Sequence, residues 1–509
     1  MPADIDLRSR MTPAPNVKLM INLGACLDIP TGHYIEGQRG ESVLNGGLGY
    51  ITGIVGIGNN FKSTIERFMM LTAMSRMMYS TAKTYDTETS IHEEHQIRVA
   101  ANIADFHHEN ILASGRWLVT DKTVYAGDEW YRLHKEELEE KRRRRDITVA
   151  TPYWNRERSA NLSMLVPTFT EIDSFSEFET SNIIEMQDEI ELGEAKGNTI
   201  DMQQGRVKNR ILMEVPRIHT SVYDYLLMTA HIGHVIDLHG GPPGTGGAAT
   251  MLRYLRNGEK IKGVPAKFTF LTHNCWHAFN AAPLVNHATK GPEYPRSSSD
   301  DLAHDTDLNA VLIRNLRGKA GPSGMPITLI VSQSDGVLPS LTEFHHIREN
   351  GHYGLEGSNT SYALALYPEV KLQRTTVRAK IDADPLLRRA LTITSEMCQM
   401  SYLWHTQPER FRLTPRALYE NLKAQGYDWK VLLDTRGWWT HEAGETRELP
   451  FLSTLDLIRM SLATGHPERY VPYWLEADRK TIKARYQRCI EAYRARDVPV
   501  DMQAGTSVA

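Results

Sequence analysis

Short apolar segments alternate with polar or helical stretches from about Leu19 to Val337, and this alternation predicts an α/β core. The segment 61–78, FKSTIERFMMLTAMSRMM, carries apolar residues at helical spacing together with many good helix formers. It therefore predicts a helix directly after the first apolar segment. We expect strands over 51–56 (ITGIVG), 147–154 (ITVATPYW), 164–173 (MLVPTFTEID), 225–232 (YLLMTAHI), 267–273 (KFTFLTH) and 325–333 (MPITLIVSQ).

Two further regions are patterned differently. The stretch 134–146, HKEELEEKRRRRD, has its acidic half before its basic half, an arrangement that suits a helix dipole and i,i+4 pairing. It fits either a solvated helix end or a basic contact with a neighbouring subunit or DNA. After Ser340 the chain is rich in Arg, Tyr, Leu and Trp, with a long final helix expected near 474–496. We expect a flexible arm over 1–18, a core over 19–384 and a mostly helical domain over 385–509.

Composition narrows the setting without choosing a function. Hydrophobic residues make up 41% of the 509 residues and charged residues 24%, which is ordinary for a globular protein. The segment 1–19 lacks an apolar signal core, and no apolar run reaches the length of a membrane span, so we expect a cytoplasmic protein without membrane partners. The four scattered cysteines fit reduced thiols. A net charge of −4 gives no general attraction to nucleic acid, although a local basic strip can still bind it.

The motif with the clearest chemistry is GIGNNFKST, between the first expected strand and the first expected helix. Glycines allow backbone N–H groups to converge on phosphate oxygens, and the following helix N-terminus favours negative charge. Lys62 is expected to reach the β- and γ-phosphates, and Ser63 to coordinate Mg²⁺. The expected nucleotide-binding residues are Gly56, Ile57, Gly58, Asn59, Asn60, Phe61, Lys62, Ser63 and Thr64.

The motif departs from G-x-x-x-x-G-K-[ST] because Phe61 replaces the second glycine. We expect Phe61 to have ordinary helical dihedral angles, with its ring turned away from the nucleotide. Two carboxylates belong to the same chemistry. Asp173 ends an apolar segment, as a Mg²⁺-holding carboxylate would, the alternative being a turn or cap. Asp86 and Glu88 follow the first helix, and a carboxylate there could activate water, although loop carboxylates are common.

These motifs, in this order, resemble the RecA-type recombinases, and among them the phage UvsX-like branch, whose loop has the form G-x-x-x-x-F-K-S. The resemblance covers roughly residues 20–360 and extends weakly to about 440. It implies a RecA-like P-loop ATPase core with a mainly parallel twisted sheet, and ATP and Mg²⁺ as cofactors. It further implies that Glu88 is the catalytic glutamate, Asp173 the Walker-B carboxylate and His231 a polar sensor of the γ-phosphate.

The same resemblance implies two mobile DNA-binding loops, over about 176–210 and 239–250. The first is acidic in its front half, and the alternative for both is a surface insertion without DNA contact. Lys260 and Lys262 are candidates to reach a neighbouring subunit's ATP. The candidate DNA-binding residues are Arg206, Lys208 and Arg210 in the first loop and Gly240, Gly241, Gly244, Thr245, Gly246 and Gly247 in the second.

The resemblance leads us to expect a DNA-dependent ATPase that forms filaments on single-stranded DNA and promotes pairing and strand exchange in recombination, repair and replication. Its partners would be single- and double-stranded DNA and copies of itself, in a phage-infected host cell. One alternative is a DnaB-type hexameric helicase, which would form rings. Another is an ATP-bound structural or regulatory protein that hydrolyses ATP very slowly.

Overall fold

The structure is a computed structural model, and its description covers most of the chain. The residues described are 18–107, 109–144, 146–155, 159–188, 197–234, 253–256, 258–297, 299, 304–358, 360–404 and 413–496.

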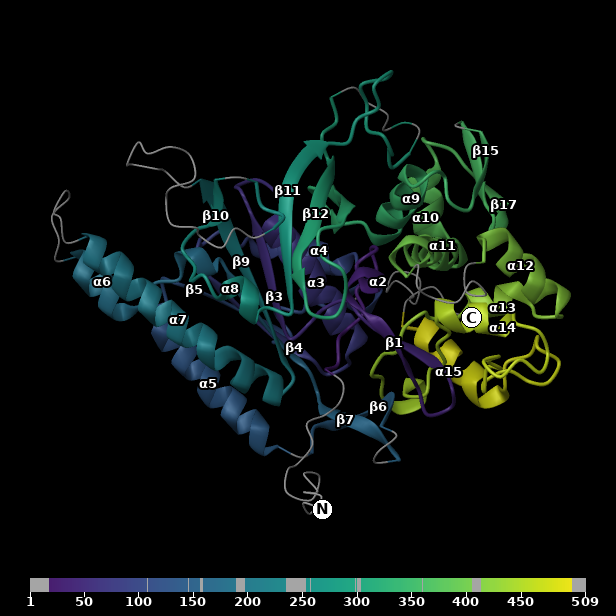
Figure 1. The fold of residues 1–509 in the computed structure, drawn as a ribbon, viewed down its shortest axis with the longest axis horizontal. Coiled ribbons are helices and arrows are strands. Elements are labelled where there is room, and N and C mark those ends of the chain that lie inside the picture. Colours follow the sequence, from purple (N-terminus) through teal and green to yellow (C-terminus); the bar gives the residue numbers. More distant parts are fainter. Residues whose placement is uncertain are drawn as a thin grey trace, which may run out of the picture.

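A central sheet of ten strands organises most of the N-terminal two thirds of the chain (Figure 1). Its order is β14-β13-β12-β11-β3-β9-β8-β4-β5, and β10 pairs with β9 beside this series. The strands are β3 (Ile51–Gly56), β4 (Thr81–Asp86), β5 (Trp117–Asp121), β8 (Thr168–Asp173), β9 (Asp224–His234), β10 (Glu259–Ile261), β11 (Asn274–Pro283), β12 (Leu308–Gly318), β13 (Pro326–Ser332) and β14 (Gly336–Val337).

The strands from β11 through β3, β9, β8 and β4 to β5 are parallel, whereas β12, β13 and β14 are added as antiparallel strands. The parallel strands therefore all end at one edge of the sheet, called the carboxyl edge below, and begin at the amino edge. All six residues of β3 are buried, as expected for a central parallel strand covered on both faces. Gly53 in β3 allows Phe268 to pack closely against the strand, because a Cβ at this position would lie 2.8 Å from the Phe268 ring.

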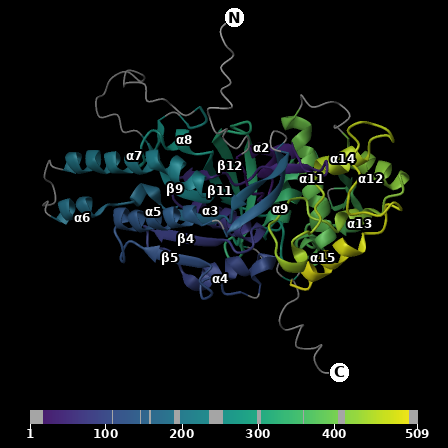
Figure 2. The same ribbon diagram turned by 90° about the horizontal axis from the view of Figure 1, so that it is seen from below.

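The helices lie against this sheet or to either side of it. The helix α3 packs against β3, β8 and β9, and α7 contacts both β9 and α5. The α5–α7 pair projects to one side, with α6 at its far end, and the C-terminal helices gather on the other side (Figures 1 and 2). The helices up to α9 are α2 (Asp28–Thr31), α3 (Lys62–Arg76), α4 (Glu93–Ala101), α5 (Gly127–Arg143), α6 (Ser181–Asp188), α7 (Gly197–Ser221), α8 (Phe268–Leu271) and α9 (Pro339–Glu349).

A second hydrophobic core gathers side chains from Leu341 to Tyr486, together with a few from the N-terminal segment and the sheet. The longest of its helices, α11 (Pro385–Leu403), has a capped N-terminus. Asp384 accepts hydrogen bonds from the amides of Leu386 and Leu387, and Pro385 occupies the first turn. Its helices are α10 (Val377–Ala383), α11 (Pro385–Leu403), α12 (Pro415–Ala424), α13 (Trp429–Leu433), α14 (Thr454–Met460) and α15 (Ala484–Arg494), and its strands are β15 (Leu355–Ser358), β16 (Ser361–Leu364) and β17 (Tyr367–Leu372).

The far end of α3 is joined to this C-terminal region. The amide of Met78 donates to the carbonyl of His441 (3.0 Å), and the amide of His441 donates to the carbonyl of Arg76 (2.9 Å). The guanidinium of Arg76 lies 3.9 Å from the ring centre of Trp438. Backbone pairing and a cation–π contact therefore hold the last turn of α3 against the segment 438–441.

The structure confirms the predicted α/β class, the expected strands at 51–56, 225–232 and 325–333, and the helix that follows the first of them. The expected strand 164–173 is divided between β7 (Ala160–Leu165) and β8. The strand 147–154 is present as β6 (Thr148–Asn155), but β6 and β7 form a hairpin outside the central sheet. Two short strands, β1 (His33–Glu36) and β2 (Ser42–Asn45), form another hairpin.

Two predictions of elements are wrong. The segment 267–273 was expected to be a strand, but it contains the short helix α8, and the strand β11 begins only at Asn274. The final helix begins at Ala484 rather than near residue 474. All four cysteines are buried and free. Over the described part of the chain, no helix combines the length and the apolar character that crossing a bilayer requires.

Candidate active site at the carboxyl edge

The pairing of the strands brings together residues that are far apart in the sequence. Gly56 at the end of β3 is the register partner of His231 in β9 and of Ala278 in β11. Asp86 at the end of β4 is in turn the partner of Asp173 at the end of β8. The loop 57–61 and the ends of β3, β8 and β4 therefore lie at the carboxyl edge, where parallel α/β sheets commonly bind ligands.

The loop between β3 and α3 is held in a fixed shape by its backbone and by Asn60. The Asn60 side chain donates to the carbonyl of Ala278 (2.8 Å). A Cβ at Gly56 would lie 2.7 Å from the same carbonyl oxygen, so this position requires glycine. Ile57, Gly58 and Asn59 are exposed at the tip. The loop thus presents a short stretch of exposed backbone ahead of a helix N-terminus.

Phe61 does not have the helical dihedral angles that we expected. Its φ of 57° and ψ of 26° are left-handed, and its ring packs against the main hydrophobic core. A non-glycine residue in this conformation costs on the order of 1–2 kcal/mol, which the packing of the partly buried ring helps to offset. Phe61 therefore adopts the kind of conformation for which glycine is normally used.

Lys62 lies at the start of α3 and bends back over the loop. Its ammonium donates to the carbonyl of Ile57 (3.0 Å), and the residue is 8% exposed. Burial lowers the pKa of Lys62, while the nearby charges of Glu88, Asp173 and Glu66 oppose that shift. Phe61 provides no side-chain cap for α3, so the amides of the first helical turn remain available to an anion.

Asp173 is buried at the end of β8 with two side-chain partners. Arg67 donates to Oδ2 (3.0 Å), and Thr229 of β9 donates to Oδ1 (2.7 Å). The following residue is fixed by Thr87, whose hydroxyl accepts from the amide of Ser174 (2.7 Å). The carboxylate of Asp173 is therefore oriented by α3 and β9.

Glu88 and His231, which lie 143 residues apart in the chain, are hydrogen-bonded through Oε1 and Nε2 at 2.9 Å. The hydrogen bond from His231 lowers the pKa of Glu88, and it outweighs the opposing effect of partial burial. Asp86 shapes the turn that carries Glu88, because its carboxylate accepts from the amides of Glu88, Ser90 and Ile91. Of the two expected carboxylates, only Glu88 projects from this turn, and it remains exposed.

Beneath these residues lies a buried charge cluster that the sequence analysis missed. Glu66 and Glu171 are both 0% exposed, and Arg67 stands between Glu171 (Nε to Oε1, 3.7 Å) and Asp173. Burial raises the pKa of Glu66 well above its usual range, and the charges of Glu171 and Asp173 add to the shift. The available signal was a Glu-Arg pair inside an otherwise apolar helix, which requires buried partners.

The candidate DNA-binding residues of the first predicted loop lie on α7, so this part of the segment is helical rather than a loop. Arg206 and Arg210 are exposed. Lys208 is 2% exposed, and its ammonium donates to the carbonyls of Ser176 (2.6 Å) and Gly263 (2.8 Å). Because its donors are used inside the protein, Lys208 cannot reach a phosphate in this conformation, and we correct its assignment to a structural role.

Lys260 and Lys262 are exposed, and Lys260 lies in β10, where it pairs with Gly233 of β9. The Lys262 amide donates to the carbonyl of His231 (2.8 Å), so both lysines lie next to the Glu88–His231 pair in the fold. The remaining expected DNA-binding residues, Gly240, Gly241, Gly244, Thr245, Gly246 and Gly247, lie outside the described residues.

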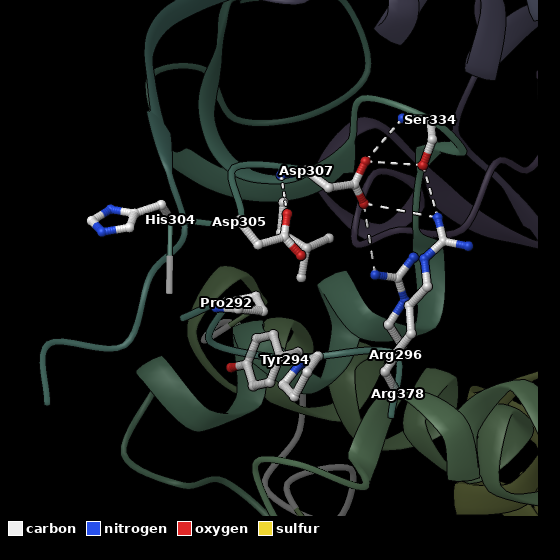
Figure 3. Close-up of a pocket in the computed structure, with 10 residues that line it drawn as sticks. Pro292, Tyr294, Arg296, His304, Asp305, Asp307, Ser334 and Arg378 are labelled. Carbon is white, nitrogen blue, oxygen red and sulfur yellow. Dashed lines mark hydrogen bonds and ion pairs between the residues drawn. The ribbon is translucent and has the colours of Figure 1, made fainter. Parts of the chain in front are cut away.

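A cavity of about 570 Å³ lies elsewhere, beside the beginning of β12 and α10. Figure 3 shows Arg296 and Arg378 pointing toward Asp307 and Ser334 along its wall. Asp307 accepts from Ser334 Oγ (2.9 Å), and both arginines also bind Asp335. These charges neutralise one another, and the lining of the cavity does not include Lys62, Asp173 or Glu88, so we place the candidate site around the loop 57–61 instead.

No known family model matches the chain, and no curated protein matches it either.

Proposed function

We propose that this chain is a DNA-dependent ATPase with a RecA-like P-loop core, and that it forms filaments on single-stranded DNA and promotes strand exchange. The observation that carries the proposal is the convergence of Lys62, Asp173 and the Glu88–His231 pair at one edge of the sheet. A phosphate-binding lysine, a metal-holding carboxylate and a residue that positions water are the parts that P-loop NTPases use.

The loop supports a role in binding phosphate. Lys62 is directed at the loop backbone, where its ammonium meets the carbonyl of Ile57, and the uncapped first turn of α3 adds helix amides. An incoming phosphate would offer the ammonium a charged partner in place of a neutral carbonyl. Gly56 and Asn60 keep this backbone fixed against Ala278, so little ordering is needed on binding.

Glu88 fits the role of the group that positions water. Its lowered pKa keeps it ionised at neutral pH, and an ionised carboxylate can accept a hydrogen bond from an attacking water. His231 holds Glu88 by its ring nitrogen and lies at the register position of Gly56, next to the loop. A change at the loop can therefore alter the Glu88–His231 contact, as a sensor of the γ-phosphate requires.

The oxygen donors at this edge fit Mg²⁺. Ser63 supplies a hydroxyl in the first turn of α3, and Asp173 supplies a carboxylate, both of which are ligand types that Mg²⁺ prefers. When bound, Mg²⁺ would neutralise charge on the phosphates. Asp173 is already oriented by Arg67 and Thr229, which reduces the rearrangement that binding requires.

The order of the sheet supports the RecA-like assignment within the α/β class. The strand that leads into the loop lies near the middle of the sheet, and β9 separates it from the strand that ends in Asp173. The DNA-binding and filament-forming parts of the proposal rest on the resemblance, supported by the exposed Arg206 and Arg210 on α7. Their guanidinium groups suit phosphate oxygens.

The test is ATP turnover by the full chain without DNA, with single-stranded DNA and with duplex. We expect single strands to stimulate turnover, and Lys62→Ala to reduce the stimulated rate by about 10²–10³-fold, the usual cost of removing one charge-stabilising group. Lys371→Ala, which removes an exposed lysine on β17, is the matched control and should leave the rate unchanged.

Electron microscopy on single strands with ATP then separates the alternatives. Filaments support the recombinase, whereas closed rings would indicate a DnaB-type helicase. Turnover that is independent of DNA, or no turnover, would overturn the proposal in favour of a nucleotide-bound structural or regulatory protein.

A further inference from the structure

A buried cluster of metal-ligand type lies at the amino edge of the sheet, at the opposite end of the strands from Lys62. It consists of His134 of α5, His219 near the end of α7 and Asp224, the first residue of β9. These residues are 3%, 0% and 1% exposed. The elements α5, α7 and β9 therefore bring two imidazoles and one carboxylate together in the interior of the protein.

One oxygen of Asp224 is the centre of this cluster. Its Oδ2 lies 2.7 Å from Nδ1 of His219 and 3.8 Å from Nε2 of His134. The hydroxyl of Thr170 on β8 lies 2.9 Å from the same oxygen and 3.3 Å from Nε2 of His134. The other oxygen, Oδ1, is occupied separately by the hydroxyl of Thr168, which Lys141 in turn contacts (2.9 Å).

The spacing of these four atoms suits a small tetrahedral ion. Ligands bound at about 2.0 Å to a tetrahedral centre are about 3.3 Å apart. The measured separations of 2.7, 2.9, 3.3 and 3.8 Å lie on both sides of that value. These are four of the six separations in a tetrahedron, and the ligand atoms of His134, His219 and Asp224 all lie within 4.8 Å of one another.

The hydrogen bonding of the two histidines is also incomplete. Within the described structure, Nδ1 of His134 and Nε2 of His219 are buried and have no hydrogen-bond partner. These two nitrogens are not the ones that face Asp224 and Thr170, so the site rests on the positions of Nε2 of His134 and Nδ1 of His219.

We propose that His134, His219 and Asp224, with the Thr170 hydroxyl as a fourth ligand, form a structural site for a zinc-like divalent cation. Two imidazoles and one carboxylate favour zinc over magnesium or calcium, which prefer oxygen ligands. The ion would tie α5 and α7 to β8 and β9, and so fix the base of the projecting helix pair. This site is separate from the proposed Mg²⁺ and ATP site at the carboxyl edge.

The test measures zinc retained by the full chain after chelation, reloading with one equivalent of Zn²⁺ and exhaustive dialysis. We expect one zinc per chain in the wild-type protein, and at least about 100-fold weaker binding in His134→Gln and His219→Gln. Because the chain has 20 histidines, the exposed His92→Gln serves as the control and should retain zinc fully. Circular dichroism checks that each variant is folded.

Cobalt provides a second measurement that does not depend on the variants. Co²⁺ bound to wild-type protein should give the visible absorption of a four-coordinate nitrogen and oxygen site, and Zn²⁺ but not Mg²⁺ should raise the melting temperature. No retained metal in the wild type, equal retention in both histidine variants, or a sulfur-to-cobalt absorption band would overturn the proposal.

Discussion

Buried carboxylates occur at the carboxyl edge and also where the sheet meets the second core, but the two regions treat them differently. At the carboxyl edge, Asp173 is paired with Arg67 next to the exposed loop. At the junction, Glu343 of α9 and Glu396 of α11 are buried, and burial raises their pKa values to about 8 and about 7. The first arrangement gives Asp173 a cationic partner beside the loop, whereas in the second burial raises the pKa values of both glutamates.

The largest expected effect comes from removing the charge that keeps Asp173 paired. Arg67→Met leaves Asp173 and Glu171 without their buried cation, so we expect the free energy of unfolding to fall by about 3–5 kcal/mol. Arg132→Met, which removes an exposed i,i+4 pair with Glu136 on α5, should cost less than about 0.5 kcal/mol. Urea denaturation measures the free energy of unfolding of both variants. Equal losses would contradict the expected difference between a buried and an exposed arginine.

The next prediction concerns chemistry at the carboxyl edge. Glu88→Gln keeps the shape of the side chain but removes the charge that positions water, so we expect ATP turnover to fall by about 10²-fold or more. Nucleotide affinity should change little, because Lys62 and the loop are untouched. Glu94→Gln, an exposed position on α4, is the control. Normal turnover in Glu88→Gln would mean that another group positions the water.

Measured per pH unit, the smallest effect is a pH dependence at the junction. Burial raises the pKa of Glu343 to about 8 despite a hydrogen bond from Thr392, and Glu396 and Asp28 add to the shift, while Arg389 opposes it. The folded state thus holds a proton that the unfolded chain releases near pH 4.5. This stabilisation is complete below pH 4.5 and is lost as the pH rises toward 8, at up to about 1.4 kcal/mol per pH unit.

Glu343→Gln should reduce this slope, because glutamine is neutral at every pH, while Glu396 continues to contribute. Glu349→Gln on the same helix, which is exposed, should keep the slope of the wild-type protein. Denaturation midpoints measured from pH 5 to 8 provide the comparison, and a Glu343→Gln slope equal to that of the wild type would show that other groups cause the dependence.

The sequence predicted local features well. The run ITGIVG is uninterrupted and apolar and is followed by helical periodicity, so the loop between β3 and α3 could be located from its neighbours alone. The strand β4, TAKTYD, was missed because its polar residues are buried by partners from other parts of the chain. The strand expected at 267–273 was wrong because F-T-F alternates like a strand, yet only Phe268 of the two aromatic residues is buried.

The candidate site also contains residues that the sequence predicted and residues that it did not. Lys62 follows from a local motif. The resemblance implied a role for Glu88 and for His231, but not the contact between them, which depends on the order of the strands. Arg67 was missed because its partners Glu171 and Asp173 lie more than 100 positions away in the sequence. Lys208 was misassigned because a lysine near other basic residues gives no sign that its ammonium is buried against backbone carbonyls.

The helix α3 has a mechanical consequence. It is a single helix of 15 residues, about 22 Å long, with Lys62 at one end and Arg76 at the other. Since it begins at the loop and is fastened to the segment 438–441 at its far end, it acts as a stiff rod between the two. A displacement of the loop would therefore be transmitted along α3 to the C-terminal region. Nucleotide binding should therefore change the amide exchange of Met78 and His441, far from the phosphates.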